Sequence, residues 1–380
     1  MSLDKQREEI NRIDKELAAL FERRMEVSAA VAREKELSGL SITDTARENA
    51  VLERVQSAVK AELAPYARQI YTYIMSLSKD YQAELLKSDS EIRSRLAPAF
   101  ASPPDFDAEH AVAVQGVEGA FSHLCAARTM KSPNLLFFDS FSAVFSAVEN
   151  GLCRYGLVPC ENSIFGSISE VYSLLAARNA YIARSVKLKV SQCLLTAPGT
   201  KLGDIKTVIS HPQALGQCAD FIKKLKLRES ERGNTAFAAR EVSELGDKSV
   251  AAIGSELCGE IYGLTVLKSD IQNEKSNYTR FLCLSREMQI PQAPDRVTVL
   301  LSLPHENGSL AACLDKIAAF GFNVSKIESM PEPGTDFQYR FVLTIDASAR
   351  EDATIRMLSQ IAENATRFRI LGGYAECVSD

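Results

Sequence analysis

One arginine interrupts an apolar stripe near the start of the chain. From Ile10 to Val31, apolar residues recur in steps of three and four, the spacing of a buried stripe on one helix, and Arg24 takes one of these positions. Arg7 lies one turn before the stripe, and Lys35 follows its end by four residues. A guanidinium in such a stripe is costly unless an anion meets it. The three cations therefore indicate a buried site for a small polyanion.

Neutral hydrogen-bonding side chains and acids accompany these cations. Ser78 and Gln82 lie one turn apart on a helix face, and Asp44, Arg47 and Glu48 surround the start of another helix. Such a set suits a dicarboxylate that carries a hydroxyl. It would hold a flexible substrate in one conformation and stabilise charge that develops on an oxygen, without a metal or a nucleophile. This chemistry fits a pericyclic rearrangement better than hydrolysis.

The cations alone leave a second interpretation open. Arg24 and Lys35 share a helix face, so pairing with glutamates across a dimer seam would explain them equally well. A break over residues 38–41 is expected to end the first helix. The helix expected over residues 4–37 is about 50 Å long, whereas a domain of this size is only about 30 Å across. Its apolar stripe therefore requires a partner chain, and we expect an intertwined dimer.

A second group of polar residues lies where predicted strands end and helices begin. Its members are Ser122, Asn162, Ser163, Gly166, Ser167, Ser210 and Thr235. Ligands of open α/β sheets bind at this edge, where helix N-termini offer unpaired N–H groups to carboxylates. Taken one at a time, each serine is better explained as an ordinary helix N-cap.

Three regions must position these residues. Residues 1–90 are expected to form an all-α dimerisation domain, and the polar, proline-rich segment 88–104 predicts an interdomain linker. Strands and helices alternate over 108–287, which predicts an α/β domain. Residues 295–380 have the order strand, helix, strand, strand, helix, strand, with the third strand over 337–345 and the last over 369–376. This order predicts an α+β ferredoxin-like domain.

Composition excludes several classes of protein. The net charge of −5 gives no sign of a nucleic-acid partner or a membrane surface. No stretch is long and apolar enough to span a bilayer and the charged start lacks an apolar signal core, so we expect a cytoplasmic protein. The nine cysteines are scattered without a C-x-x-C pair, so a metal site is not expected.

The run Arg7-Glu8-Glu9-Ile10 to Asp14-Lys15-Glu16-Leu17, together with the polar set described above, resembles an all-helical chorismate mutase. The resemblance implies that this set binds the substrate. Arg7, reaching from a partner chain, and Arg24 would bind carboxylates, Lys35 and Gln82 the ether oxygen, and Glu48 the ring hydroxyl, with Asp44, Arg47 and Ser78 completing the pocket.

Four segments of the central region are similar to prephenate dehydratase: Gly119-Ala120-Phe121-Ser122-His123, Glu161-Asn162-Ser163, Ser210-His211-Pro212-Gln213 and Asn277-Tyr278-Thr279-Arg280-Phe281. The resemblance implies a two-lobed domain in which Thr279 donates a hydrogen bond or proton to the departing ring hydroxyl while the carboxylate leaves as carbon dioxide. The residues implied to support the substrate are Ser122, Asn162, Ser163, Ser210, Gln217 and Arg280. Arg280 has a second interpretation, as a member of a structural ion pair.

The C-terminal segments Gly308-Ser309-Leu310 and Lys326-Ile327-Glu328-Ser329-Met330-Pro331 look like those of an ACT regulatory domain. The resemblance implies a phenylalanine site between paired domains, with Gly308, Ser309, Leu310, Glu328 and Ser329 as effector-binding residues. Met330 stands where the family usually has arginine, and Ser309 where alanine is common. A dimerisation sheet without a ligand is the alternative.

The order of the three resemblances implies a bifunctional chorismate mutase–prephenate dehydratase without a cofactor. Its expected partners are chorismate, prephenate, the effector L-phenylalanine and further copies of the chain, as a homodimer or higher homo-oligomer. Two other interpretations stay open. One is a dehydratase that uses arogenate, since Phe121, Asn234 and Gln192 depart from the usual pattern. The other is a phenylalanine-binding regulator without catalysis.

Overall fold

The computed structural model describes residues 3–38, 44–85, 90–336 and 338–379 of the 380-residue chain. The chain divides into two compact units, residues 1–95 with 355–363 and residues 96–354 with 364–380. The break expected after the first helix, at Ser38-Gly39-Leu40-Ser41, lies beyond Ser38 outside the described residues. Within the described part of the chain, no helix is both long and apolar enough to cross a membrane.

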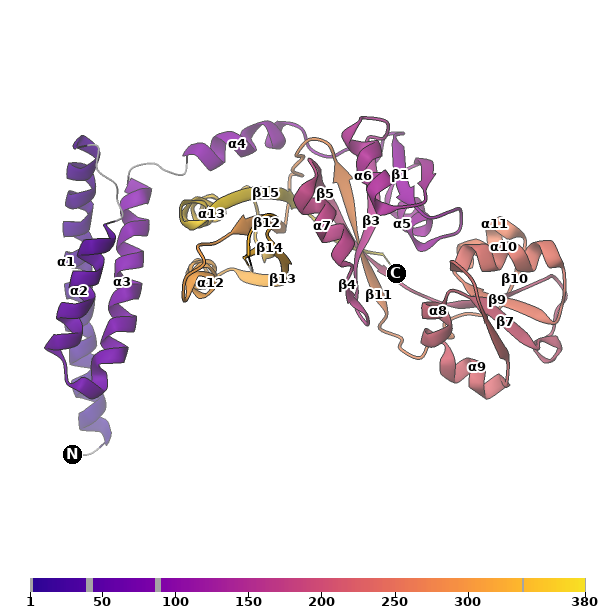
Figure 1. The fold of residues 1–380 in the computed structure, drawn as a ribbon, viewed down its shortest axis with the longest axis horizontal. Helices are drawn as coiled ribbons and strands as arrows, with labels where there is room; N and C mark the ends of the chain where they lie inside the picture. The colour runs from indigo at the N-terminus through magenta and orange to yellow at the C-terminus, as the bar shows by residue number, and fades with distance from the viewer. Residues whose placement is uncertain (1–2, 39–43, 86–89, 337, 380) are drawn as a thin grey trace. The chain divides into compact units, whose positions relative to one another are not determined.

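The N-terminal region contains the predicted helices: α1 (Leu3–Leu37), α2 (Thr45–Ala58) and α3 (Ala64–Leu85), with a short turn of 3-10 helix, η1 (Ala61–Leu63), before α3 (Figure 1). Asp44 caps α2, because its side chain accepts a hydrogen bond from the Arg47 N–H at 3.0 Å. α3 packs against both α1 and α2.

The apolar stripe of α1 is exposed within one chain. Ile10, Leu20 and Val31 are 55%, 62% and 42% exposed, whereas Ser28 and Ala32 are buried. The burial predicted for the stripe is therefore not reached inside a single chain, because α3 covers the neighbouring face of α1, which carries small residues.

The segment predicted to be a linker contains a helix, α4 (Ser90–Ala101), and residues 88 and 89 lie outside the described part. Leu96 and Ala99 of α4 are buried. The carbonyl oxygen of Ala99 accepts a hydrogen bond from the Ile290 N–H at 3.1 Å, and that of Phe100 accepts one from Arg350 Nη2 at 3.2 Å. The end of α4, from Leu96 onward, thus belongs to the second unit.

The central α/β region contains two mixed sheets (Figure 1). The first has the order β16-β5-β11-β3-β1-β2, with β4 paired to β3. Its elements are β1 (Ala111–Gln115), α5 (Phe121–Thr129), β2 (Asn134–Phe138), α6 (Phe141–Glu149), β3 (Tyr155–Asn162), β4 (Gly166–Ser167), α7 (Ser169–Ala177), β5 (Tyr181–Lys189), β11 (Tyr278–Ser285) and β16 (Glu376–Ser379).

The second sheet has the order β10-β6-β9-β7-β8. Its elements are β6 (Cys193–Thr196), η2 (Leu202–Asp204), β7 (Thr207–Ser210), α8 (Pro212–Gln217), α9 (Ala219–Leu225), β8 (Arg228–Glu231), α10 (Thr235–Leu245), β9 (Val250–Gly254), α11 (Glu256–Tyr262) and β10 (Thr265–Lys268). The chain passes between the sheets twice, from β5 to β6 and from β10 to β11, as the predicted two lobes require.

The C-terminal region has the predicted element order: β12 (Arg296–Ser302), α12 (Ser309–Ala319), β13 (Asn323–Pro331), β14 (Tyr339–Asp346), α13 (Asp352–Asn364) and β15 (Arg367–Tyr374). The start predicted for the third strand, Phe337, lies outside the described residues. The four strands form an antiparallel sheet in the order β13-β14-β12-β15.

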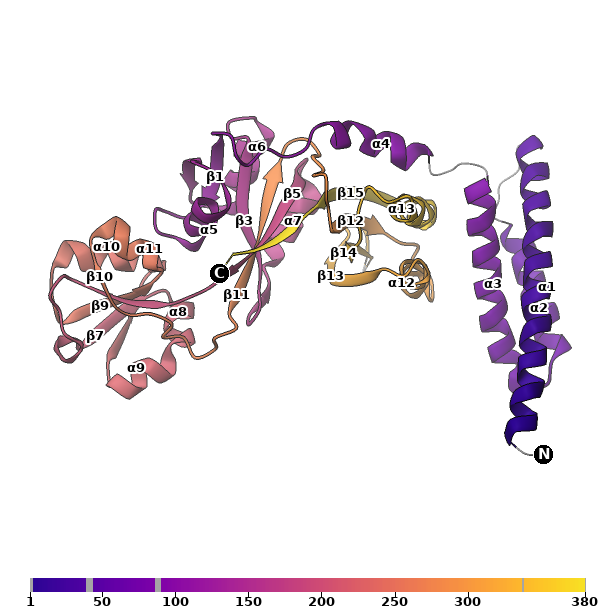
Figure 2. The ribbon, with the colours of Figure 1, turned by 180° about the vertical axis from the view of Figure 1, so that it is seen from behind.

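The end of the chain leaves this sheet. A single strand was expected over 369–376, but the chain breaks pairing after Tyr374, and β16 then pairs in parallel with β5 of the first central sheet (Figure 2). The two regions also share a core, in which Val342 and Leu371 belong to the same buried cluster as Phe145 and Ile182. The C-terminal sheet and the first lobe are therefore one packed body.

Candidate active sites

The first site lies between α1 and α3. Arg24 donates hydrogen bonds to Ser78 Oγ and, at 3.5 Å, to the carbonyl oxygen of Ile74. One turn further along both helices, Gln82 Nε2 lies 2.6 Å from Ser28 Oγ. The facing turns of α1 and α3 therefore carry a row of polar side chains in an otherwise packed interface, and the predicted residues Arg24, Ser78 and Gln82 come together.

Gln82 has an acceptor with no partner. Its side chain is buried, and no described residue donates a hydrogen bond to Oε1. The two ends of an amide are assigned from their hydrogen bonds. If the amide is turned by 180°, Ser28 donates to Oε1 and the NH₂ group of Gln82 becomes free to donate to a ligand.

The other predicted residues of this region lie on or beside α1 and α2. Glu48 Oε2 lies 3.0 Å from Lys79 Nζ, with both side chains mostly buried. Asp44 is occupied as the cap of α2, Lys35 is half-buried, and Arg47 is exposed. Arg7 is also exposed, with its guanidinium 3.9 Å from Asp4.

The sequence interpretation missed Ser28 and Lys79. The sequence could have indicated both, since Ser28 follows Arg24 by one helical turn and Lys79 is the neighbour of Ser78.

The second site lies at the ends of β3 and β11, where Asn162 and Thr279 are direct cross-strand partners. Asn162 Oδ1 accepts hydrogen bonds from the N–H groups of Ile164 and Phe165 at 3.0 and 3.2 Å. These two bonds fix the orientation of the amide, so Nδ2 must be the atom that faces Thr279. Nδ2 donates to Thr279 Oγ1 at 3.1 Å. The hydroxyl of Thr279 is thereby used as an acceptor, and its own proton is free to point at a ligand.

Two amides with unpartnered atoms lie where the chain passes between the lobes. Asn277 is fully buried and accepts from Asn162 Nδ2 at 2.9 Å, but no described residue accepts from its own Nδ2. Gln192 donates to Gln217 Oε1 at 3.0 Å, while its own buried Oε1 has no donor among the described residues. Buried polar groups without partners are costly, so these atoms indicate a polar ligand between the lobes. Asn277 was quoted as part of a motif but missed as a site residue.

The side chains of the predicted serines form hydrogen bonds with main-chain groups. Ser210 is fully buried and donates to the Ile253 carbonyl oxygen at 2.6 Å, and Ser122 donates to the carbonyl oxygen of Gln115. Ser163 accepts from the Tyr278 N–H at 2.9 Å. The Ser163 bond holds the start of β11 next to Thr279, whereas Ser210 and Ser122 hold backbone of other strands. Substrate contact by these serines stays a prediction.

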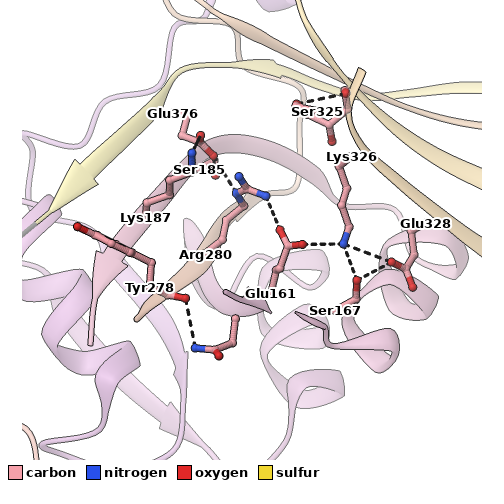
Figure 3. Close-up of polar contacts among 12 residues, drawn as sticks. Glu161, Ser167, Ser185, Lys187, Tyr278, Arg280, Ser325, Lys326, Glu328 and Glu376 are labelled. Carbon is pink, nitrogen blue, oxygen red and sulfur yellow. Dashed lines mark hydrogen bonds and ion pairs between the residues drawn. The ribbon is translucent and has the colours of Figure 1, made fainter. Parts of the chain in front are cut away.

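Arg280 lies on the opposite face of β11 from Thr279, because consecutive side chains alternate along a strand. Its guanidinium pairs with Glu161 and, at 2.9 Å, with Glu376 (Figure 3). Burial would lower the pKa of Arg280, but Glu376 and Glu161 together raise it above its ordinary value. The geometry favours the structural ion pair over substrate binding for Arg280.

The predicted effector residues lie at the start of α12 and along β13. Gly308 precedes α12 with φ +87°, a conformation that favours glycine, and open space surrounds it. Ser309 and Leu310 follow it and are half-buried. The backbone there is accessible to a ligand.

Glu328 and Ser329 point to opposite faces of β13. Glu328 accepts from Ser167 Oγ at 2.6 Å, in the first lobe, whereas Ser329 is exposed. Met330, on the same face as Glu328, is 5% exposed in the shared core. The two predicted effector side chains therefore cannot line one side of a single pocket.

Comparison with known proteins identifies relatives for both regions. A family model of chorismate mutase type II matches residues 6–83, and one of prephenate dehydratase matches residues 112–289. The bifunctional chorismate mutase/prephenate dehydratase of Escherichia coli (strain K12) is 31% identical over 379 residues, which cover 97% of this chain and 95% of that protein. The arogenate dehydratase/prephenate dehydratase 1, chloroplastic, of Arabidopsis thaliana is 33% identical over 342 residues, 85% of this chain and 87% of that protein.

Among solved structures, the prephenate dehydratase of Arthrobacter aurescens in complex with L-Phe is similar to this chain. It is 27% identical with a TM-score of 0.63, and the match covers 70% of this chain and 90% of that one.

Proposed function

The chain belongs to the family of bifunctional chorismate mutase/prephenate dehydratases, and from this premise we propose that it catalyses two consecutive reactions at two separate sites. The site between α1 and α3 rearranges chorismate to prephenate. The site at the ends of β3 and β11 converts prephenate to phenylpyruvate, carbon dioxide and water.

The mutase site acts by positioning and charge. Arg24, together with Arg7 from a partner chain, binds the two carboxylates and holds the reacting carbons in contact. Lys35 and the turned amide of Gln82 donate to the ether oxygen, on which negative charge grows as its bond to carbon breaks. Glu48 accepts from the ring hydroxyl, and Asp44, Arg47 and Ser78 complete the pocket. The exposed stripe of α1 supports the dimer that this arrangement requires.

The dehydratase site acts through one hydroxyl proton. Asn162 donates to Thr279 Oγ1 at 3.1 Å, so the Thr279 proton is directed at the departing ring hydroxyl. Loss of the ring carboxylate as carbon dioxide supplies the electron pair that aromatises the ring while the hydroxyl leaves as water. This hydrogen bond is the observation that carries the dehydratase assignment.

We further propose three functional domains: a mutase domain over 1–90, a dehydratase domain over 108–287 and an ACT domain over 295–380. The strand order β13-β14-β12-β15 supports the third, and the L-Phe complex of the Arthrobacter aurescens enzyme supports phenylalanine as its effector. Phenylalanine binds near Gly308 between paired domains and lowers dehydratase activity.

Arogenate is the alternative substrate of the second site, since the relative from Arabidopsis thaliana carries both dehydratase names. Comparing turnover of the two purified substrates decides between them.

The decisive assay incubates purified protein with chorismate and follows phenylpyruvate, with and without phenylalanine. We expect prephenate to form and to be consumed, and phenylalanine to slow only its consumption. Prephenate that accumulates without conversion would refute the second activity, and binding of phenylalanine without any turnover would identify a regulator instead.

A further inference from the structure

Four charged residues are joined by ion pairs on the reverse face of the strands that carry Asn162 and Thr279, and they form the charged group Glu161, Arg280, Lys326 and Glu376. We propose that one of them, Lys326, is a positioning residue for the dehydratase: from the C-terminal sheet it holds Glu161, and through Glu161 it fixes the hydrogen bond between Asn162 and Thr279. This inference rests on the proposed role of Thr279.

Lys326 reaches from β13 into the first lobe (Figure 3). Its Nζ lies 2.8 Å from Glu161 Oε1, 2.5 Å from Ser167 Oγ and 3.5 Å from Glu328 Oε2. The Lys326 side chain is only 14% exposed. A long ammonium side chain loses much freedom and hydration in such a place, so its contacts must be well defined to compensate.

Glu161 connects Lys326 to Arg280 on β11. Its other carboxylate oxygen pairs with Arg280, and Arg280 also pairs with Glu376, which lies 2.7 Å from Lys187 Nζ and is 7% exposed. The chain of contacts therefore runs from β13 through β3 and β11 to β16, and it is half-buried along its length.

The backbone connects the two faces of these strands. Glu161 precedes Asn162 on β3, Arg280 follows Thr279 on β11, and the cross-strand register pairs Asn162 with Thr279 and Glu161 with Arg280. The register shifts directly after Arg280, so the regular ladder is interrupted at this end of the sheet. The ion pair on the reverse face is thus placed to fix the separation of the two strands where the site residues stand.

Removal of the Lys326 charge leaves the carboxylates of Glu161 and Glu328 without the ammonium that both of them contact. Like charges at such distances repel. Glu161 is then expected to turn away and to shift Arg280 and the two strand ends. Such a displacement of the Thr279 hydroxyl affects the reaction step more than substrate affinity, because a small misplacement of a reacting group is costly.

The test uses the full-length protein and measures both activities. We expect Lys326→Met to lower dehydratase kcat by about tenfold to 100-fold, to change the KM for prephenate by less than about threefold, and to leave mutase kcat/KM unchanged. Lys326→Arg keeps the charge and is expected to restore most of the loss. The matched control is Arg178→Met, which removes another partly buried ion pair of the same unit, 3.2 Å from Glu149.

Three outcomes would overturn the proposal. They are an unchanged dehydratase kcat in Lys326→Met, an equal loss in Arg178→Met, and a loss confined to KM. If Lys326→Met does not fold, Lys326→Gln replaces it, since glutamine keeps a hydrogen bond to Ser167 without the charge, and the same loss of kcat is expected. Wild-type protein that does not consume prephenate refutes the dehydratase itself, whereas active wild-type protein with an equally active Lys326 variant refutes only the positioning role.

Discussion

The two candidate sites are built by different kinds of structure. In the helical region the site residues lie on successive turns of α1 and α3, and they contact one another directly across the interface of the two helices. In the central region Asn162 and Thr279 lie on adjacent strands, and their geometry is supported from behind by Glu161, Arg280 and residues of the C-terminal sheet. The first site is thus formed by two packed helices, whereas the second is backed by residues far away in sequence.

The two sites also differ in how complete they are within one chain. α1 exposes an apolar stripe, and Arg7 near its start is exposed, with its guanidinium 3.9 Å from Asp4. Thr279, in contrast, has its hydrogen-bond donor in the same sheet. We therefore expect the mutase to depend on association of two chains and the dehydratase chemistry to depend on the fold of one.

Thr279→Ala tests the separation of the sites with the largest expected effect. It removes the hydroxyl that Asn162 orients, so dehydratase kcat is expected to fall about 10²–10⁴-fold, the usual range for a lost general acid. Mutase kcat/KM, measured on chorismate in the same preparation, is expected to stay within twofold. Thr279→Ser keeps a hydroxyl and serves as the control. Parallel loss of both activities in a folded variant would contradict separate sites.

Arg24→Ala is the reciprocal test. Loss of a cation that meets a carboxylate and developing charge is expected to lower mutase kcat/KM about 10²–10³-fold, with the dehydratase unaffected. Arg23→Ala, at the exposed neighbouring position, is the control and is expected to keep both activities. If the two variants lose mutase activity equally, the effect belongs to the helix and not to the site.

Leu20→Asp tests whether the mutase needs two chains. A carboxylate buried in an apolar dimer seam is expected to weaken the dimer roughly 100-fold, or about 2.7 kcal/mol. Sedimentation would then show more monomer, and mutase activity would fall with dilution while the dehydratase changes less. Glu22→Gln, on another face of α1, is the control. A Leu20 variant with undiminished mutase activity and mass would remove the reason to place Arg7 in a partner's site.

The contrast between a site on neighbouring helical turns and a site backed by distant residues explains which features the sequence predicts well. The helices of the first 90 residues and the polar row on α1 and α3 follow from a periodicity that is read over neighbouring turns. The chemistry-bearing motifs around Asn162 and Thr279 are equally local. The β-α-β-β-α-β order of the C-terminal region is also correct because each element has its own alternation or helical period.

Contacts between distant parts of the chain leave no local pattern in the sequence from which they could be predicted. The pairing of β16 with β5 joins residues about 190 positions apart, and the Lys326–Glu161 pair joins residues 165 apart. The sequence placed Arg280 at the substrate, with a structural ion pair as the alternative, and it gave no sign of the partner Glu376, since a four-residue strand carries almost no pattern. The stripe of α1 shows the converse: its helical period was read correctly, yet the stripe is exposed in the single chain, and its coverage by a second chain stays a prediction.

The smallest expected effect concerns the carboxylate at the end of the charged group, Glu376. Although burial opposes it, Lys187 and Arg280 lower the pKa of Glu376 below its ordinary value of 4.5 in the folded chain. A carboxyl whose pKa is depressed by folding stabilises the folded state above its ordinary pKa, and this contribution is lost as the pH falls through the folded-state pKa. Glu376→Gln is therefore expected to lower the unfolding free energy at pH 7, and to lower it progressively less below about pH 4.5.

Urea unfolding at a series of pH values measures the difference between the two proteins. Glu287→Gln is the control, because Glu287 is 72% exposed beside Arg286 and such surface pairs contribute little at any pH. A difference for Glu376→Gln that stays constant on acidification would show that Glu376 acts through packing and hydrogen bonds, whereas a difference that vanishes would show that its charge holds β16 to the dehydratase sheet. The second result would extend the contrast between the sites. At acidic pH the dehydratase site would lose the ion pairs of Glu376 on the reverse face of its strands, whereas the contacts between α1 and α3 would remain.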